Sequence, residues 1–356
     1  LNNLAAQPAI DGNLKLARLN LRNWLQSQGI AVPEMANKEA LSNFEAAVTM
    51  KSSGDKTDIT ALNIGLDQTI IQGNAKLAGN HIGFDLQVDQ INIDDYLPAV
   101  EEKSAAAKPA KTDASGKTTT EEAPLFPVDM LRTLDIDGKV GIDKLIASKL
   151  TSEQVKANIV ARNGDIRLNT QIGRFYQGAF DARTSLNVAE KTPKLSVNTN
   201  LQNLQAGPLL KDLTGQDKLT GTGRFKMAIN SSGNSVTAIK QALNGTADFR
   251  FDNGAVKGVN LAKLLRETKA RFEGKSVPKS DEPEQTDFSE LSGSAKITNG
   301  IINNQDLLAK SPFLRIGGAG TVNLLKETVD YTVEARVVST DKWQGGEELK
   351  DLEGLN

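Results

Sequence analysis

The sequence contains no cysteine and a single histidine, His81, among its 356 residues. Without thiols the chain has no disulfide and no thiolate nucleophile. A lone imidazole completes neither a common zinc site nor a nucleophile–base pair. We expect His81 to be a surface residue at the end of a strand. Adjacent carboxylates at 94–95 and 101–102 fit helix capping and a solvated linker. The sequence therefore predicts a protein that is not an enzyme and that needs neither a metal nor a cofactor.

An excess of charge of one sign is also missing, because 42 Lys and Arg stand against 44 Asp and Glu, for a net charge of −2. No basic cluster stands out, which excludes nucleic acid as an expected partner. No apolar run approaches the roughly 20 residues that span a bilayer, and no signal peptide opens the chain. Because the sequence starts at Leu1 in mid-pattern, we expect a trimmed chain that lacks a membrane anchor.

Aromatic residues are scarce, at 4% of the chain, whereas apolar residues in all reach 38%. There is enough aliphatic surface for a core but little of the aromatic bulk that fills a thick one. The composition therefore favours thin layers over a globule.

Alternation of apolar and polar residues is the main positive signal. In residues 288–338, apolar side chains occupy every second position at Val329, Tyr331, Val333, Ala335 and Val337. This period gives a strand one apolar face. Turn signals such as Asn-Gly at 299–300 separate the segments, and the glycines of 317–320 allow a bend. The pattern recurs along the chain and predicts more than a dozen antiparallel strands.

Short helices are predicted after some of these strands, where an asparagine precedes a brief amphipathic stretch. Such an asparagine accepts a hydrogen bond from the free amides of a helix N-terminus. The units begin at residues 20, 92, 203 and 260, so their spacing is too uneven for a strict solenoid. In the last unit, one helix face is predicted to hold Leu261, Leu264, Leu265, Thr268 and Phe272.

So few helices cannot cover the apolar face of so many strands. Either a second sheet packs on the first as a sandwich, or one long sheet curls into a trough that faces an apolar ligand. We expect an all-β, elongated, curled antiparallel sheet with a few short helices. The residues predicted to line its apolar face are Ile159, Leu168, Phe180, Leu186, Val197, Phe225, Phe249 and Val333. In a sandwich the same residues would form a dry core.

Composition also divides the chain. Residues 1–98 and 128–340 carry the alternating pattern, and residues 99–127 are rich in Ala, Lys, Thr and Glu, which is typical of a disordered linker. Residues 341–356 form a polar C-terminal segment that we expect to be truncated.

Two stretches resemble a known family. LNGTADFRFDNGAVKGVNLAKLLRE at 243–267, followed by the segment at 288–338, is similar to the C-terminal region of the AsmA family of Gram-negative bacteria. The likeness is specific over about residues 240–340, and FDLQVDQINIDDYLP at 84–98 extends it.

The resemblance implies a bridge-like lipid transfer protein with a repeating β-groove. Family members have an N-terminal helix in the inner membrane and a periplasmic groove that is thought to carry phospholipid toward the outer membrane. It implies phospholipid acyl chains, the two membranes and outer-membrane proteins as partners. The alternative function is a scaffold or holdase that helps outer-membrane proteins assemble by pairing with their strands at exposed sheet edges.

Overall fold

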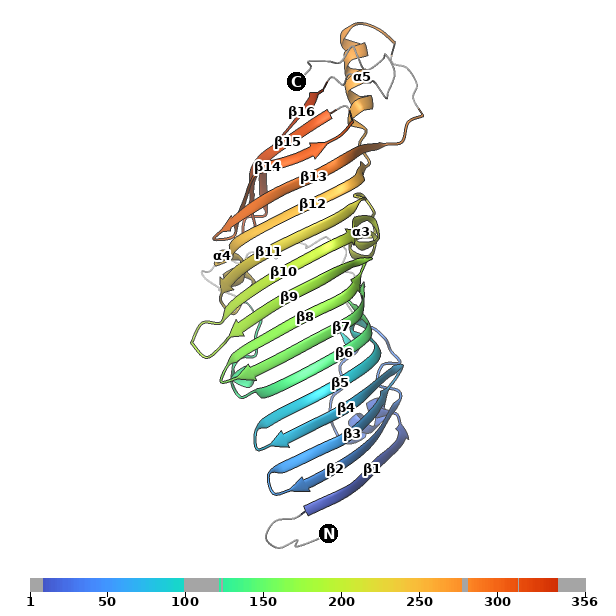
Figure 1. Ribbon diagram of the computed structural model, residues 1–356, viewed down its shortest axis with the longest axis vertical. Coiled ribbons are helices and arrows are strands. Elements are labelled where there is room, and N and C mark those ends of the chain that lie inside the picture. Colours follow the sequence, from blue (N-terminus) through green and yellow to red (C-terminus); the bar gives the residue numbers. More distant parts are fainter. Residues whose placement is uncertain (1–8, 99–121, 123, 277–280, 313, 339–356) are drawn as a thin grey trace, which may run out of the picture.

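The computed structural model describes residues 9–98, 122, 124–276, 281–312 and 314–338. They form one sheet of 16 strands, and the strands lie side by side in the order of the sequence. The sheet is much longer across its strands than along them, with the N- and C-terminal strands at opposite ends (Figure 1). This arrangement confirms the predicted all-β fold with one elongated antiparallel sheet, which departs from the prediction in one parallel pair of strands.

The strands are β1 (Ala9–Leu19), β2 (Phe44–Ser53), β3 (Lys56–Leu66), β4 (Thr69–Ala78), β5 (His81–Asn92), β6 (Asp135–Ala147), β7 (Leu150–Arg162), β8 (Asp165–Phe175), β9 (Gly178–Asn187), β10 (Lys194–Gln205), β11 (Thr222–Ser232), β12 (Asn244–Lys257), β13 (Gln285–Thr298), β14 (Ile301–Lys310), β15 (Leu314–Asn323) and β16 (Thr328–Val337). The helices are α1 (Leu21–Ser27), η1 (Ile93–Tyr96), α2 (Val128–Arg132), α3 (Ala206–Thr214), α4 (Val236–Gln241) and α5 (Leu261–Phe272).

Neighbouring strands are antiparallel except for β5 and β6, which run in the same direction. His81 pairs with Asp135, so both strands begin at the same rim of the sheet and the chain between them joins the two rims. The predicted linker falls in this connection, and most of it lies outside the described residues. At its end, the backbone amide of Phe126 donates to Oδ1 of Asn234 at 2.7 Å. The predicted segment 341–356 also lies outside the described residues.

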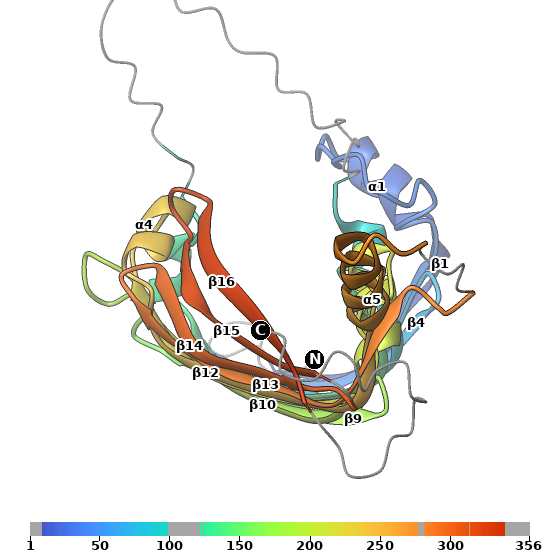
Figure 2. The same cartoon turned by 90° about the horizontal axis from the view of Figure 1, so that it is seen from above.

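Seen down its long axis, the sheet has the cross-section of an open trough. Helices lie on the open side of this curve (Figure 2). Helix α5 lies inside the curve and packs Leu261 and Leu265 against Leu314 and Val337 of the sheet. The face that carries these apolar residues is therefore the concave face. Residues paired across neighbouring strands share a face, so the hydrogen-bond register assigns every other strand residue to the concave or the convex side.

No second sheet covers the concave face in the described part of the chain. Its side chains are mostly half-buried. Leu314 and Val188 are the largest described side chains with less than 2% exposure. A sandwich core would bury most side chains of this face completely. Of the two architectures that the sequence left open, the curled single sheet is the one found.

Three of the four predicted asparagine caps form as expected. The side chains of Asn20, Asn92 and Asn260 accept from the backbone amides of residues 23, 94 and 263 respectively. The prediction for Asn203 was wrong. Asn203 lies within β10 with a φ of 56°, and α3 instead follows Gln205, which makes no side-chain cap.

Residues with positive φ inside strands help to explain the curl. Gln154, Asn203 and Asn253 have φ values of 56°, 56° and 52° within β7, β10 and β12. A residue in this conformation bends and twists the strand as a β-bulge does. These strands therefore bend at positions that the alternation of apolar and polar residues does not reveal.

Candidate functional site: the concave face

One row of paired residues crosses all 16 strands on the concave face, and we call it the central row. It contains no charged side chain. From β1 to β16 it consists of Gly12, Met50, Ile59, Ala75, Phe84, Gly138, Ile159, Leu168, Thr184, Val197, Ile229, Gly245, Ile297, Ile302, Val322 and Val329.

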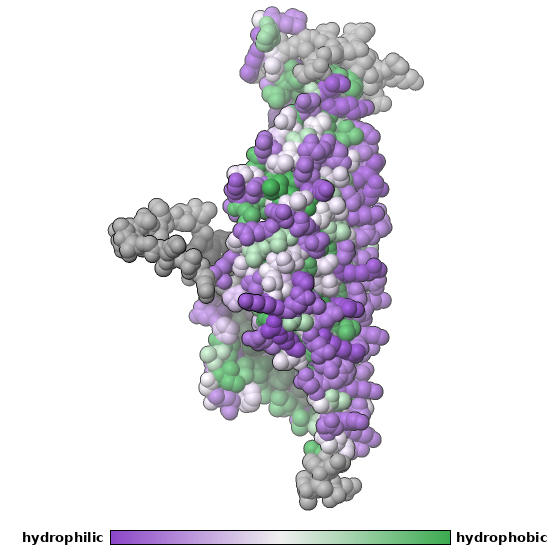
Figure 3. Space-filling model, turned by 90° about the vertical axis from the view of Figure 1, so that its left-hand side faces the viewer, coloured by the Kyte–Doolittle hydropathy of each residue, from purple (hydrophilic) through white to green (hydrophobic). Residues whose placement is uncertain are grey.

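The convex face has the opposite chemistry. The neighbouring row on that face runs through Asp11, Lys51, Asp58 and Lys76 in successive strands. Such opposite charges attract each other and stay hydrated, and Lys51 Nζ lies 3.2 Å from Asp11. In Figure 3, hydrophilic residues cover the convex side at the right of the view and hydrophobic residues gather in the hollow at the lower left. The sheet is thus polar outside and apolar inside the curve.

All eight predicted lining residues lie on the concave face. Ile159, Leu168 and Val197 belong to the central row. A second row joins Phe180, Phe225 and Phe249 through Leu201, and Leu186 pairs with Ile166 and Leu195. Seven of the eight are half-buried, whereas Val333 on the edge strand β16 is 59% exposed. Their contact with a lipid stays a prediction.

Glycines on the concave face give aromatic rings room to lie flat, a feature that the sequence analysis missed. A Cβ added to Gly138 would lie 2.1 Å from the Cζ of Phe84, and one added to Gly223 would lie 2.3 Å from the Cε1 of Phe251. A ring that rests on a neighbouring glycine covers backbone without standing up from the sheet. These pairs become visible only through the register, because Phe84 and Gly138 are far apart in the sequence.

The glycine-rich stretch 317–320 serves the same purpose in β15. A Cβ on Gly318 would lie 2.9 Å from Tyr331 Cε1, and a Cβ on Gly320 would lie 2.3 Å from the backbone oxygen of Asp330. The Tyr331 hydroxyl donates to the side-chain oxygen of Asn304. The predicted bend is therefore also a place where the phenol ring lies against the sheet.

The concave face is long on the scale of a lipid. Strands about 4.8 Å apart give the 16-stranded sheet a length of about 70 Å. One leaflet of a bilayer's hydrocarbon core is about 15 Å thick, so several acyl chains would fit end to end. A continuous apolar strip with no charge has one chemical capability, which is to keep hydrocarbon away from water.

Both ends of the concave face are open among the described residues. On β1, Leu14 is 63% exposed and Leu16 is 42% exposed, and on β16 Val329 is 68% exposed. The backbone edges of these two strands have no further strand paired to them in the described part. The apolar strip therefore continues to both edges of the sheet and is closed at neither.

The rim carries polar contacts with a structural role. The Asp67 carboxylate accepts from the backbone amides of Leu41 and Asn43 at 2.8 and 3.0 Å and from the Tyr96 hydroxyl at 2.9 Å. Burial and the hydrogen bond to Asp67 raise the pKa of Tyr96 to about 12. Asp94 accepts from the amides of the turn at 148–149. These carboxylates hold loops and turns in place.

His81 lies at the start of β5, as predicted, with its Nδ1 2.9 Å from Asp135 Oδ1. Among the described residues, no group of three or more His, Cys, Asp and Glu side chains is placed to hold a metal ion. None of the described helices combines the length and the hydropathy that a membrane crossing requires.

A model of the AsmA family matches residues 5–307 of this chain. The chain is also similar to Protein AsmA of Escherichia coli (strain K12), with 20% identity over 340 residues. That match covers 93% of this chain and 54% of the relative, so the chain spans about half the length of the curated relative it matches. No solved structure matches this chain.

Proposed function

The chain belongs to the AsmA family, and on that premise we propose that its concave face is a groove that carries phospholipid acyl chains between the inner and outer membranes. The uncharged central row across all 16 strands is the observation that carries this proposal. In this proposal the chain is a periplasmic domain of an inner-membrane-anchored protein of a Gram-negative bacterium. Its cargo then supports the homeostasis and assembly of the outer membrane.

The energetics of lipid movement favour such a groove. Each methylene exposed to water costs roughly 0.8 kcal/mol, so a two-chain phospholipid crossing water unprotected faces a cost on the order of 20 kcal/mol. A continuous apolar floor removes much of that cost at every step. The open side of the curve leaves the charged head group in water, where it keeps its hydration.

Lack of strong polar contacts also suits a conduit. A floor of aliphatic and aromatic side chains attracts hydrocarbon without direction and with similar strength at each position. The cargo then meets no deep minimum along about 70 Å of sheet. Shallow binding of this kind lets a lipid slide, whereas a site built from ion pairs or hydrogen bonds would hold it.

Mass spectrometry of the purified chain under native conditions tests the proposal. The wild-type chain is expected to carry phospholipid. Val197→Asp places a charge in the central row and should lower the bound amount several-fold, because a carboxylate in hydrocarbon loses its hydration. Asn198→Asp is the matched control, since Asn198 is the next residue on β10 and is exposed on the convex face. A wild-type chain that carries no phospholipid would overturn the proposal.

The alternative is a scaffold or holdase for outer-membrane proteins. It is favoured by the unpaired edges of β1 and β16 in the described part of the chain, which offer backbone groups to an incoming strand. A photo-crosslinking residue at Val329 of β16 should then capture client polypeptide rather than lipid. Capture of lipid alone at that position would argue against the scaffold.

A further inference from the structure

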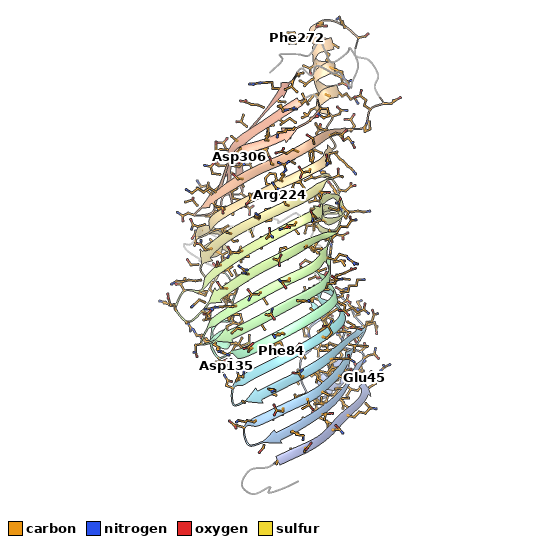
Figure 4. The ribbon with its side chains drawn as sticks, viewed as in Figure 1. Glu45, Phe84, Asp135, Arg224, Phe272 and Asp306 are labelled. Atoms are coloured by element: carbon orange, nitrogen blue, oxygen red, sulfur yellow. The ribbon has the colours of Figure 1, made fainter. Side chains whose placement is uncertain are left out.

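Helix α5 has an apolar face that runs past the end of the sheet. Leu261 and Leu265, near its start, pack on the cluster formed with Leu314 and Val337. One and two turns further on, Thr268 and Phe272 follow on the same face. The helix projects beyond β16 (Figure 1), and Phe272 lies at the extremity of the molecule (Figure 4). The far half of this face therefore has no strand beneath it among the described residues.

Phe272 is 94% exposed, the highest value of any large hydrophobic side chain that the structure describes. Leu264, two turns before it, is 54% exposed. A phenylalanine this exposed gains free energy when a partner removes its ring from water. The α5 tip, residues 268–276, is therefore considered as a contact surface together with its charge.

The charge at the α5 tip is positive. In sequence it contains Lys269, Arg271 and Lys275 against a single acidic residue, Glu273. Glu273 lies 2.8 Å from Lys275, and Arg271 is exposed beside Phe272. Closer to the body of the helix, Lys263 and Arg266 are already paired with Glu284 and Glu282. The sequence of the α5 tip therefore has an excess of positive charge, and the exposed cation Arg271 is adjacent to Phe272.

From these observations we propose that the α5 tip docks on a phospholipid bilayer that contains anionic lipid, with Phe272 inserted among the head groups. A bilayer accepts a single aromatic wedge flanked by cations. A stable protein partner requires more than about 1,000 Å² of complementary surface, and two exposed apolar side chains fall far short of that. The chemistry thus selects a membrane rather than a folded protein.

Docking would place the end of the groove at the membrane, and only this role rests on the proposed function. The same helix that carries Phe272 packs on β15 and β16, the last two strands of the sheet. A bilayer that holds the α5 tip therefore faces the edge strand β16, on which Val333, four residues before Val337, is 59% exposed. Lipid would leave or enter the groove there. A single aromatic anchor also binds weakly and reversibly, which suits repeated contact.

Vesicle sedimentation of the full chain tests the inference. Vesicles of phosphatidylethanolamine and phosphatidylglycerol should bind the wild-type chain, and Phe272→Ser should weaken binding by about tenfold or more. Arg271→Gln should weaken binding to these vesicles but leave binding to pure phosphatidylcholine vesicles unchanged. Ile70→Thr is the control, because Ile70 is 47% exposed but lies on β4, far from the tip.

Circular dichroism would show that Phe272→Ser folds, as expected for so exposed a residue. The inference is overturned if the wild-type chain does not bind vesicles, if Phe272→Ser binds as well as the wild type, or if Ile70→Thr loses binding equally. Bound phospholipid, measured by native mass spectrometry, should be unchanged in Phe272→Ser. Vesicle binding without any bound phospholipid would contradict the groove and leave the docking inference standing.

Discussion

Gly138→Ala tests whether the concave face depends on rings that lie flat over glycines. The added Cβ would lie 2.1, 2.3 and 2.7 Å from the Cζ, Cε2 and Cε1 atoms of Phe84. Carbon atoms in contact are about 3.5–4.0 Å apart, so the ring must move by more than 1 Å. Neighbouring strands prevent sideways movement, and the ring is expected to lift away from the sheet into the space above it.

The cost should resemble other cases of overpacking, about 1 to 3 kcal/mol. Gly12→Ala is the matched control, because Gly12 belongs to the same central row and an added Cβ there would have nothing within 4 Å. We expect it to change stability by less than about 0.5 kcal/mol. In the double variant Phe84→Leu/Gly138→Ala the penalty of the Gly138 substitution should shrink, which a double-mutant cycle measures as coupling.

Urea denaturation gives the stabilities, and hydrogen exchange read by mass spectrometry locates the change. Each strand touches mainly its two neighbours in an extended sheet, so faster exchange should be confined to β5, β6 and the strands beside them. Equal stabilities of Gly138→Ala and Gly12→Ala would show that the Phe84 ring does not need the space above Gly138. Faster exchange throughout the sheet would refute the claim that the effect is local.

Three further predictions concern polar groups at the rims and on the convex face. Burial, together with hydrogen bonds to Asp67 and Asp212, raises the pKa of Tyr96 and Tyr176 to about 12. The contribution of these two phenols to folding stability should therefore be complete below pH 10 and be lost as the pH rises toward 12. Ultraviolet titration of the wild type and Tyr96→Phe should show the late ionisation of the Tyr96 phenol. Asp67→Ala should cost about 2 kcal/mol of folding free energy in urea denaturation, because two backbone amides and a phenol lose their acceptor. Hydrogen bonding from Lys310, which lies 2.8 Å away, and the charge of Arg250 lower the pKa of Glu290. The contribution of the Glu290–Lys310 ion pair to folding stability should then be present at neutral pH and fall as the pH drops below about 4.3. Glu290→Gln should remove that pH dependence.

Alternation carried most of the fold prediction, because a period of two assigns each strand residue to a face without any knowledge of its neighbours. Ile159 and Leu168 were predicted to share the apolar face for this reason, and the register pairs them. Asparagine caps were predictable too, since capping depends on residues within one turn. The same local signal failed at Asn203, where an asparagine tolerates positive φ inside a strand as readily as it caps a helix.

Features that depend on residues distant in sequence were not predictable. The parallel pairing of β5 and β6 joins His81 with Asp135 across the connection, and no local pattern reports strand direction. Room for the Phe84 ring depends on Gly138 in the next strand of the sheet. Helical periodicity placed Leu261 and Phe272 on one face, but it could not show that the sheet ends before Phe272. In each case the missing information was the partner and not the residue itself.

Photo-crosslinking along the concave face would show whether hydrocarbon occupies this face over its whole length. A photoreactive residue would replace one position at a time in the central row or the row beside it: Val48, Val197 and Val322. The controls are their neighbours on the convex face: Ala47, Asn198 and Thr321. If hydrocarbon fills the groove, phospholipid adducts form at all three concave positions and at none of the controls. Adducts at neither set, or equally at both, would contradict this occupancy.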